Sequence, residues 1–136
     1  MRTTELAVDT AGQTVVDLTD RVAGFLREAG GGDGLLHVFV PHATAGLIVM
    51  ETGSGSEEDL EETLDRLLPK DDRYVHRHGS RGHGADHLLP LLASPSLTVP
   101  VLGGRAALGT WQRICLLDRN SDNPRRTVRL SLLEDG

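Results

Sequence analysis

The chain has 136 residues, a length typical of one domain, and a formal net charge of −6 at pH 7. An acidic chain is a poor default partner for nucleic acid, because the phosphate backbone attracts basic surfaces. No run approaches the ~18 apolar residues of a membrane span, and the first residues lack the layout of a signal peptide. With one cysteine, Cys115, the chain cannot form an internal disulfide, which favours the reducing cytoplasm.

The hydrophobic pattern predicts strands and helices in alternation. Strands are predicted at residues 3–8, 35–40, 47–49, 97–102, 106–117 and 127–133. Helices are predicted at residues 17–29 and 57–68, with a short one at 87–93 that Pro90 interrupts. Residues 71–84 are polar and rich in glycine, so they are expected to form a loop. This order predicts an α+β fold, mainly antiparallel, in one domain over residues 1–136.

Histidine is the most informative residue type for function. Six are present, and four of them lie between His76 and His87. On a helix His83 and His87 share one face, and His76 and His78 share one face of an extended segment. Imidazole is the commonest protein ligand of metal ions and the usual proton carrier near neutral pH. With His42, this region can supply a metal site; the alternative is a solvated polar loop that happens to be rich in histidine.

Two further segments combine small residues with polar ones. Residues 42–46 (His-Ala-Thr-Ala-Gly) follow a strand end, where amides and hydroxyls can meet an anion, or where an ordinary turn can lie. Residues 108–112 (Leu-Gly-Thr-Trp-Gln) contain the single tryptophan. Trp111 is either an apolar wall of a ligand site or a core residue beside a bulge at Gly109.

Other residues are weaker candidates for a functional role, because most of them also have an ordinary structural explanation. Glu51 follows a strand and is an acid, a base, a ligand or simply solvated. His37 lies in an apolar run, where a hydrogen-bonded strand residue is expected more often than a ligand. Cys115 lies among Ile and Leu, which predicts a buried and inert thiol. The arginines near the C-terminal end, including Arg126, can bind a small phosphate.

Taken in order, these motifs resemble the YjbQ family. The resemblance rests on Leu35-Leu36-His37, His42-Ala43-Thr44-Ala45, Glu51, Asp59, Pro69, Tyr74, His76, His87, residues 96–101, Gly103-Gly104-Arg105, residues 108–112 and Arg125-Arg126. It covers nearly the whole chain, and the Leu-Gly-Thr-Trp-Gln block after the paired histidines is quite specific.

The resemblance implies a sandwich-like α+β fold with two to three helices, assembled as a homotrimer. It also implies an activity: a secondary thiamine-phosphate synthase joins a hydroxymethylpyrimidine diphosphate to a thiazole phosphate. The resemblance, together with this chain's own residues, gives candidates for three roles; among them His83 is an addition of this chain and not a family residue. The catalytic candidates are Glu51, His76 and His87; the phosphate-binding candidates are Thr44, Thr110, Gln112 and Arg126; the candidate ligands of a divalent ion (Zn or Mg) are His42, His76, His87 and His83.

The chain departs from the family pattern near the last histidine. Gly82 and His83 stand where the family tends to have an acidic pair, and Leu89 stands where it tends to have lysine. Loss of a cation and of carboxylates from a site for two phosphorylated substrates predicts weak synthase activity. The alternatives are a non-catalytic trimer that binds a metal or a phosphate ligand, and a metal-assisted hydrolase of a small phosphorylated molecule.

Overall fold

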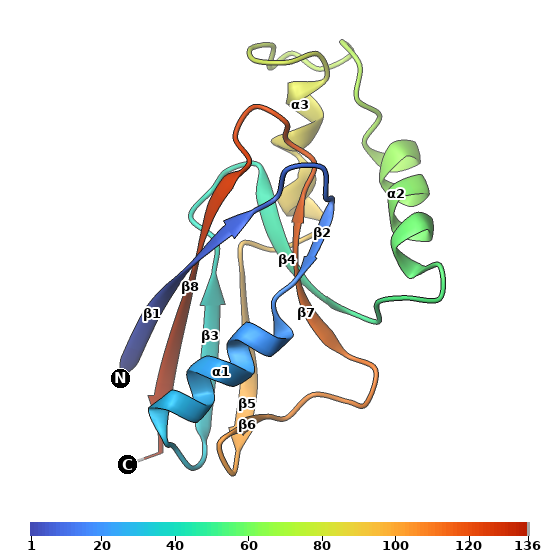
Figure 1. The fold of residues 1–136 in the computed structure, drawn as a ribbon. Helices are drawn as coiled ribbons and strands as arrows, with labels where there is room; N and C mark the ends of the chain where they lie inside the picture. Colours follow the sequence, from blue (N-terminus) through green and yellow to red (C-terminus); the bar gives the residue numbers. More distant parts are fainter. Residues whose placement is uncertain (136) are drawn as a thin grey trace.

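The computed structural model describes residues 1–135 and shows two antiparallel sheets that face each other (Figure 1). The larger sheet has the strand order β1-β8-β3-β5-β6, and the smaller has the order β2-β7-β4. The strands are β1 (Arg2–Asp9), β2 (Val15–Asp17), β3 (Gly34–Phe39), β4 (Ala45–Met50), β5 (Ser96–Leu102), β6 (Arg105–Ala106), β7 (Arg113–Asp118) and β8 (Arg125–Glu134). Within residues 1–135, the paired strands all run antiparallel to each other.

Within the described residues 1–135, three α-helices and one 3₁₀ turn complete the fold. They are α1 (Thr19–Ala29), α2 (Ser56–Leu67), α3 (His83–Asp86) and η1 (Leu89–Leu91). Helix α1 lies along one end of the sheets, whereas α2 and α3 lie at the other end (Figure 1). Among residues 1–135, no helix combines the length and the apolar composition that a membrane crossing requires.

The core lies between the sheets because alternate residues of each strand point inward. In the larger sheet, the register places buried Leu36 opposite Leu132 and buried Val38 opposite Leu130. The smaller sheet contributes Ile114 and Leu116, which are both fully buried. Burial of each such side chain is worth about 1.5–3 kcal/mol, so this apolar layer supplies much of the stability that aromatic residues provide in other domains.

A second apolar cluster supports the segment that carries the histidines. Its buried members are Leu64 of α2, Leu89 of η1, Ala93 and Leu117 of β7. These contacts hold α2 and η1 against the smaller sheet. They also fix where residues 71–88 leave and rejoin the body of the protein.

The predicted α+β class, the antiparallel sandwich and the two long helices are confirmed. The predicted strand at 106–117 is wrong: the chain leaves β6 after Ala106 and re-enters a strand at Arg113. A turn intervenes because Gln112 N–H donates to the Gly109 carbonyl (3.1 Å), and Gly109 N–H donates to Gln112 Oε1 (2.8 Å). Trp111 lies on this turn with 71% of its surface exposed, so it is not a core residue.

The short helix predicted at 87–93 is also wrong in position. The helical turn comes earlier, in α3, and only a 3₁₀ turn with Pro90 near its start lies in the predicted range. Proline cannot donate a backbone hydrogen bond, which limits any helix to a short turn there. Strand β2 was not predicted; its three residues are too few for a periodic pattern, and pairing with β7 creates the strand.

Candidate metal centre

Four histidine side chains converge at the end of the molecule that carries α3. The four are His76, His78, His83 and His87, and one ring nitrogen of each lies within 4.8 Å of the corresponding nitrogens of the others. His83 begins α3 and His87 directly follows it, while His76 and His78 come from the preceding loop. The ring centroids of His76 and His87 are 4.1 Å apart, and those of His76 and His78 are 4.2 Å apart.

Glycine makes this convergence sterically feasible. Gly82 has φ +77°, a conformation that favours glycine, and it places the start of α3 against the backbone of Lys70. A Cβ atom at Gly84 would lie 2.6 Å from both the His76 carbonyl oxygen and Tyr74 Cβ. The loop that carries His76 therefore packs directly on the α3 backbone, and this close packing brings the two pairs of histidines together.

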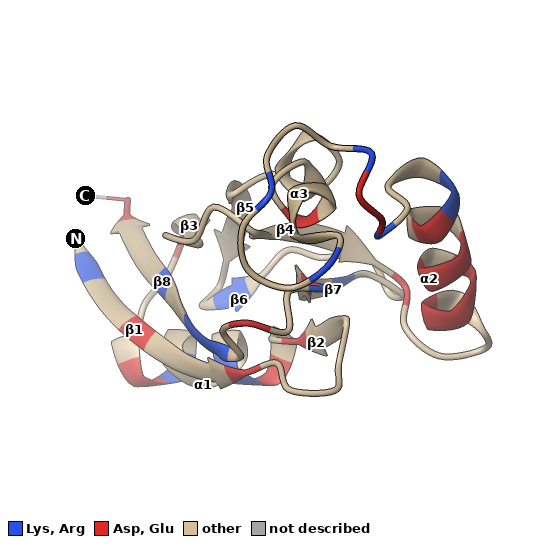
Figure 2. Cartoon of the chain, turned by 90° about the horizontal axis from the view of Figure 1, so that it is seen from above, with Lys and Arg blue, Asp and Glu red and all other residues tan. Residues whose placement is uncertain are grey.

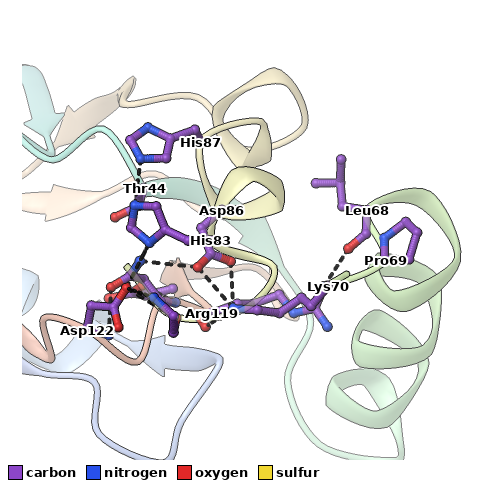
Figure 3. Close-up of polar contacts among 12 residues, drawn as sticks. Thr44, Leu68, Pro69, Lys70, His83, Asp86, His87, Arg119 and Asp122 are labelled. Carbon is purple, nitrogen blue, oxygen red and sulfur yellow. Dashed lines mark hydrogen bonds and ion pairs between the residues drawn. The ribbon is translucent and has the colours of Figure 1, made fainter. Parts of the chain in front are cut away.

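His83 is held by partners on both sides of its ring. Its Nδ1 lies 2.9 Å from Asp122 Oδ2 and 2.9 Å from Asn120 Nδ2, both in the loop between β7 and β8. On the other side, its Nε2 lies 2.8 Å from His87 Nε2 (Figure 3). Donation from Nδ1–H to Asp122 leaves the Nε2 lone pair directed at the other histidines. A carboxylate on the far nitrogen is the usual support of a metal-binding histidine.

A buried ion pair anchors the base of the site. Lys70 Nζ donates to both carboxylate oxygens of Asp86 (2.8 and 2.9 Å) and to the Arg119 carbonyl (2.9 Å) (Figure 3). Asp86 is only 2% exposed and also accepts a hydrogen bond from Asn120 Nδ2 (3.2 Å). The pair thus connects α3 to the end of β7, and it satisfies a carboxylate that would otherwise be costly to bury.

The electrostatics of the site favour neutral imidazole. Burial lowers the pKa of His87 from its ordinary value of 6.5, and the nearby rings of His76, His83 and His78 lower this pKa further. Hydrogen bonds from the backbone and side chain of Ser80, with His83 beside them, lower the pKa of Asp122. A neutral ring and an ionised carboxylate are the protonation states that a histidine-based metal site requires.

Four imidazole nitrogens suit a transition-metal ion of intermediate softness, such as Zn²⁺. In a tetrahedral zinc site with Zn–N bonds of about 2.0–2.1 Å, ligand nitrogens lie roughly 3.4 Å apart. The present contacts bracket this value, since His83 and His87 are at 2.8 Å and the whole group lies within 4.8 Å. Small rotations of the imidazole rings would therefore bring the four nitrogens to the spacing of a tetrahedral zinc site. Nitrogen ligands suit zinc, copper, nickel or iron, whereas magnesium prefers oxygen, so the donor set favours zinc over magnesium.

A small hollow of about 150 Å³ adjoins the cluster. It is lined by His76, His78 and His83 and by residues 71–72, 77, 79–82 and 84, which include Arg77 and Arg81. Arg81 lies 3.7 Å from Asp72, and both side chains are largely exposed. Figure 2 shows basic segments in the loops around α3, whereas acidic residues gather along α2. The hollow therefore places charges of both signs next to the histidines, since Asp71 and Asp72 line it as well.

The structure separates His42 from the four-histidine group. His42 Nε2 accepts a hydrogen bond from the Thr127 backbone N–H at 2.9 Å. Burial, followed by the charge of Arg126, lowers the pKa of His42 below its ordinary value. Within one chain, this ring acts as a neutral acceptor that joins the start of β4 to β8.

The phosphate-binding candidates lie in two other places. Arg126 is buried; its Nε lies 2.6 Å from Asp118 Oδ2, and its Nη2 donates to Thr44 Oγ1 at 2.7 Å. Thr44 and Arg126 are thus paired inside the protein. Thr110 and Gln112 lie in the exposed turn before β7, and Glu51 is exposed just after β4.

Three other residues singled out in the sequence have clear structural positions. Leu89 is 1% exposed and belongs to the second apolar cluster, so it does not line the histidine site. His37 is an exposed strand residue with Nδ1 3.1 Å from Thr98 Oγ1, as predicted. Cys115 is buried as predicted, and burial raises the pKa of its thiol to about 12.

Several residues of the site were not assigned to it from the sequence. His78 had a visible signal, since it lies two residues after His76 and extended spacing places both on one side. Asp122, Asn120 and Lys70 gave no local signal, because their role depends on contacts that span 16 to 49 residues. Arg77 and Arg81 looked like ordinary charges of a polar loop.

Comparison with known proteins gives one consistent result. The family model described as UPF0047 protein YjbQ-like matches residues 4–135. A UPF0047 protein of Mycobacterium tuberculosis is 63% identical over 98% of this chain and 99% of its own length. The UPF0047 protein YugU of Bacillus subtilis is 31% identical over 88% of this chain and 89% of its own.

Solved structures agree in fold. A hypothetical protein of Aeropyrum pernix K1 superposes with a TM-score of 0.90 at 34% identity, over 99% of this chain and 100% of that one. A YbjQ-like protein of unknown function from Sulfolobus solfataricus also gives 0.90, at 25% identity, over 98% of this chain and 97% of that one. The chain therefore belongs to the YjbQ-like UPF0047 family.

Proposed function

We propose that this protein binds a divalent transition-metal ion, with zinc favoured, through His76, His78, His83 and His87. The observation that carries the proposal is the convergence of four ring nitrogens within 4.8 Å. Two further contacts support it: Asp122 on the far nitrogen of His83, and a lowered pKa at His87 that leaves the ring neutral. Four imidazoles this close repel one another when protonated, which favours the neutral rings whose nitrogen lone pairs can bind one shared ion.

The metal proposal has a direct test. The chain is purified without a histidine tag, dialysed against zinc, cobalt or magnesium, and its metal content is measured by elemental analysis. We expect about one zinc or cobalt ion per chain and little magnesium. His76→Ala and His87→Ala should lower the affinity at least tenfold, while His37→Ala, which removes an exposed histidine outside the cluster, should not. Equal metal content in the natural chain and in His87→Ala would remove His87 from the site.

The proposed ligand of the metal-loaded site is a small phosphorylated molecule. Support comes from Arg77 and Arg81, which line the adjoining hollow together with Asp71 and Asp72. A metal ion and guanidinium groups together stabilise phosphate oxygens. If all four histidines bind the ion, its tetrahedral shell is closed, which favours a binding role. If only three bind, an open position remains for substrate, which favours catalysis.

For catalysis, our first candidate is the thiamine-phosphate synthase type of transfer suggested by the sequence. A bound ion can stabilise the departing diphosphate, but the same histidine cannot ligate the ion and carry a proton. Thus His76 and His87 are either ligands or acid-base groups, with Glu51 a further candidate. We propose slow turnover, since Thr44 and Arg126 are already paired within the protein. Metal-assisted hydrolysis of the same ligand class is the alternative.

The assay uses the pyrimidine diphosphate and the thiazole phosphate with zinc-loaded protein, and measures released pyrophosphate and thiamine phosphate. Slow, metal-dependent formation of thiamine phosphate supports the transferase. Release of inorganic phosphate from either substrate alone supports the hydrolase. Metal-dependent binding without any product supports the non-catalytic alternative. Product formation that persists in metal-free protein and in His87→Ala would contradict a role for the metal centre in the chemistry.

We propose, too, that the chain assembles as a homotrimer and works in the cytoplasm. Support for assembly comes from the outer face of the larger sheet, where Leu35, Leu102 and Leu133 are about half exposed. The register places Leu35 opposite Leu133, so two of these leucines form one apolar pair on the surface. Light scattering should give three times the 14.6 kDa mass of the chain. A monomer at micromolar concentration would contradict this assembly.

A further inference from the structure

A cavity lies away from the histidines, between α1 and the turn before β6. Its volume is about 470 Å³, within the range of small-molecule sites, compared with about 150 Å³ for the hollow beside the metal centre. It is lined by Thr19, Ala23, Leu26, Arg27, Gly30, Gly31, Gly103, Gly104, Arg105 and Ala106. In Figure 1 this is the end of the molecule opposite α3.

The lining of this groove is cationic although the protein is acidic. Arg27 lies in the last turn of α1, and Arg105 begins β6, whereas no Asp or Glu is among the lining residues. The chain as a whole has a net charge of −6. Two arginines, one from α1 and one from β6, thus contribute to the lining. The nearest carboxylates on the rim, Asp33 at Gly103 and Glu134 at Gly31, belong to residues outside the lining. Guanidinium groups in such a position attract oxyanions.

The rim of the groove is built from two glycine turns that are bonded together. Gly104 N–H donates to the Gly32 carbonyl (3.0 Å), and Gly103 N–H donates to Asp33 Oδ1 (2.8 Å). Gly104 has φ +79°, and a Cβ there would lie 3.0 Å from the Gly31 carbonyl oxygen. The two turns therefore hold each other in place, and the absence of side chains keeps the space above them open.

The groove also has an apolar part. Ala23 and Leu26 of α1 and Ala106 of β6 supply this part of the lining. An inorganic ion alone would leave it exposed to water, whereas an apolar ring or short chain would cover it. The combination selects a ligand with one oxyanion group and a compact apolar body.

We propose that this groove is a second binding site, independent of the metal centre, for a small organic anion of this kind. The anionic group, a phosphate or a carboxylate, pairs with Arg27 and Arg105. The apolar body lies on Ala23 and Ala106. Because the groove and the histidines lie at opposite ends of the fold, occupation of one site does not require the other.

The test is a ¹⁵N–¹H NMR titration of the full-length, metal-free chain with phenyl phosphate, benzoate and phenol. We expect saturable shifts at the amides of Gly31, Gly104 and Arg105 with one or both anions, and none with neutral phenol. Comparison of phenyl phosphate with benzoate identifies the preferred oxyanion. Arg27→Ala and Arg105→Ala should each weaken binding about tenfold, the usual loss for one charge-assisted contact.

Two further variants make the outcome decisive. Arg66→Ala removes the same charge from α2, outside the groove, and should leave binding unchanged. Ala23→Phe keeps both arginines but fills the groove, and should abolish the shifts while the rest of the spectrum stays folded. Binding that survives Ala23→Phe, or that is unaffected by both groove arginines, overturns the proposal. Shifts confined to Gly79 and Gly82 would place the anion beside the histidines and would also overturn it, whether or not that site holds metal.

Discussion

Asp122 Oδ2 lies 2.9 Å from Nδ1 of His83, on the side of the ring that faces away from the other histidines. The carboxylate is itself oriented by Ser80, whose backbone N–H donates to the same oxygen at 3.0 Å. With Nδ1 as the donor to Asp122, Nε2 faces the other histidines as the ligand atom. Asp122, 39 positions further along the chain, thus favours this tautomer of the one buried histidine in the cluster, against the amide donor Asn120 Nδ2, which also lies 2.9 Å from Nδ1.

Replacement of Asp122 by Asn should lower zinc affinity by about 10–100-fold without removing a ligand, because a supporting carboxylate raises the basicity of the metal-binding ring. Competition titration with a chromophoric chelator measures the change. Glu62→Gln, which removes one negative charge from the exposed face of α2, is the matched control and should bind zinc normally. Unchanged affinity in Asp122→Asn would show that the Asp122 contact does not orient His83.

Removal of the proposed metal ion should destabilise the protein. An ion present at 100 times its dissociation constant stabilises the folded state by about 2.7 kcal/mol. For a domain of this size that corresponds to roughly 10 °C in Tm. Thermal unfolding with zinc and then with excess chelator measures the difference, which should vanish in a variant with His83 and His87 both changed to Ala. A chelator effect of equal size in that variant would point to a different metal site.

The long elements of the fold follow from the sequence because their signals are local. The leucine and valine spacing of α1, and the alternation in β3 and β8, reflect which side of each element is buried. Segments whose shape depends on distant partners could not be predicted from the sequence. Strand β2 is such a segment, because it becomes a strand only by pairing with β7. The turn around Trp111 was missed for another reason: it is closed by local Gly109–Gln112 hydrogen bonds inside a run that reads as one strand.

The same distinction explains which parts of the site were predicted. Histidine clustering between residues 76 and 87 was visible because all four ligands lie within twelve positions. The prediction that His83 and His87 share a helical face agrees with their 2.8 Å contact. In contrast, His42 was grouped with them as a possible further ligand, both from its residue type and from the family resemblance, whereas in the fold its ring accepts a hydrogen bond from the Thr127 backbone N–H. No spacing rule connects Asp122 or Lys70 to the site.

The position of Leu89 changes what a lysine there would do. From the sequence, Leu89→Lys would restore a cation to the phosphate site. The structure places Leu89 in an apolar cluster at 1% exposure, so the charge would be buried without a partner. We expect Leu89→Lys to lower the free energy of unfolding by roughly 3–5 kcal/mol and to add no phosphate affinity.

Leu91 provides the control for this experiment. It lies in the same 3₁₀ turn but is 80% exposed, so Leu91→Lys should change stability by no more than about 0.5 kcal/mol. Urea unfolding of both variants measures the difference. A stable Leu89→Lys protein with tighter phosphate binding would mean that this segment repacks and that position 89 does reach the site.

His42 should make the protein less stable in mild acid. Its folded pKa lies below the ordinary 6.5, so the unfolded chain takes up the proton first as pH falls. The contribution of neutral His42 to the free energy of unfolding is fully present above pH 6.5. It is lost progressively as the pH falls from 6.5 towards the pKa of His42 in the folded protein. Protonation would also replace the acceptor of the Thr127 N–H with a donor. Unfolding curves from about pH 7.5 to about pH 5 should show a smaller loss in His42→Gln than in the natural chain; equal slopes would exclude His42 as a source of the pH dependence.

Gly84 allows the geometry of the metal centre to be disturbed without touching a ligand. A methyl group at this position would lie 2.6 Å from the His76 carbonyl oxygen and from Tyr74 Cβ, so the loop that carries His76 and His78 has to move away from α3. Because metal ligands must converge to within a few tenths of an ångström, Gly84→Ala should reduce zinc affinity at least tenfold. Gly24→Ala is the control, because its new methyl group would meet only the end of the Arg27 side chain, at 3.7 Å. Alanine in the middle of α1 should raise the free energy of unfolding by about 0.5–1 kcal/mol. Zinc binding of this control should be unchanged. Calorimetric titration of both variants with zinc separates the two effects, and full affinity in Gly84→Ala would mean that His76 and His78 are not held to the ion by the packing of this loop.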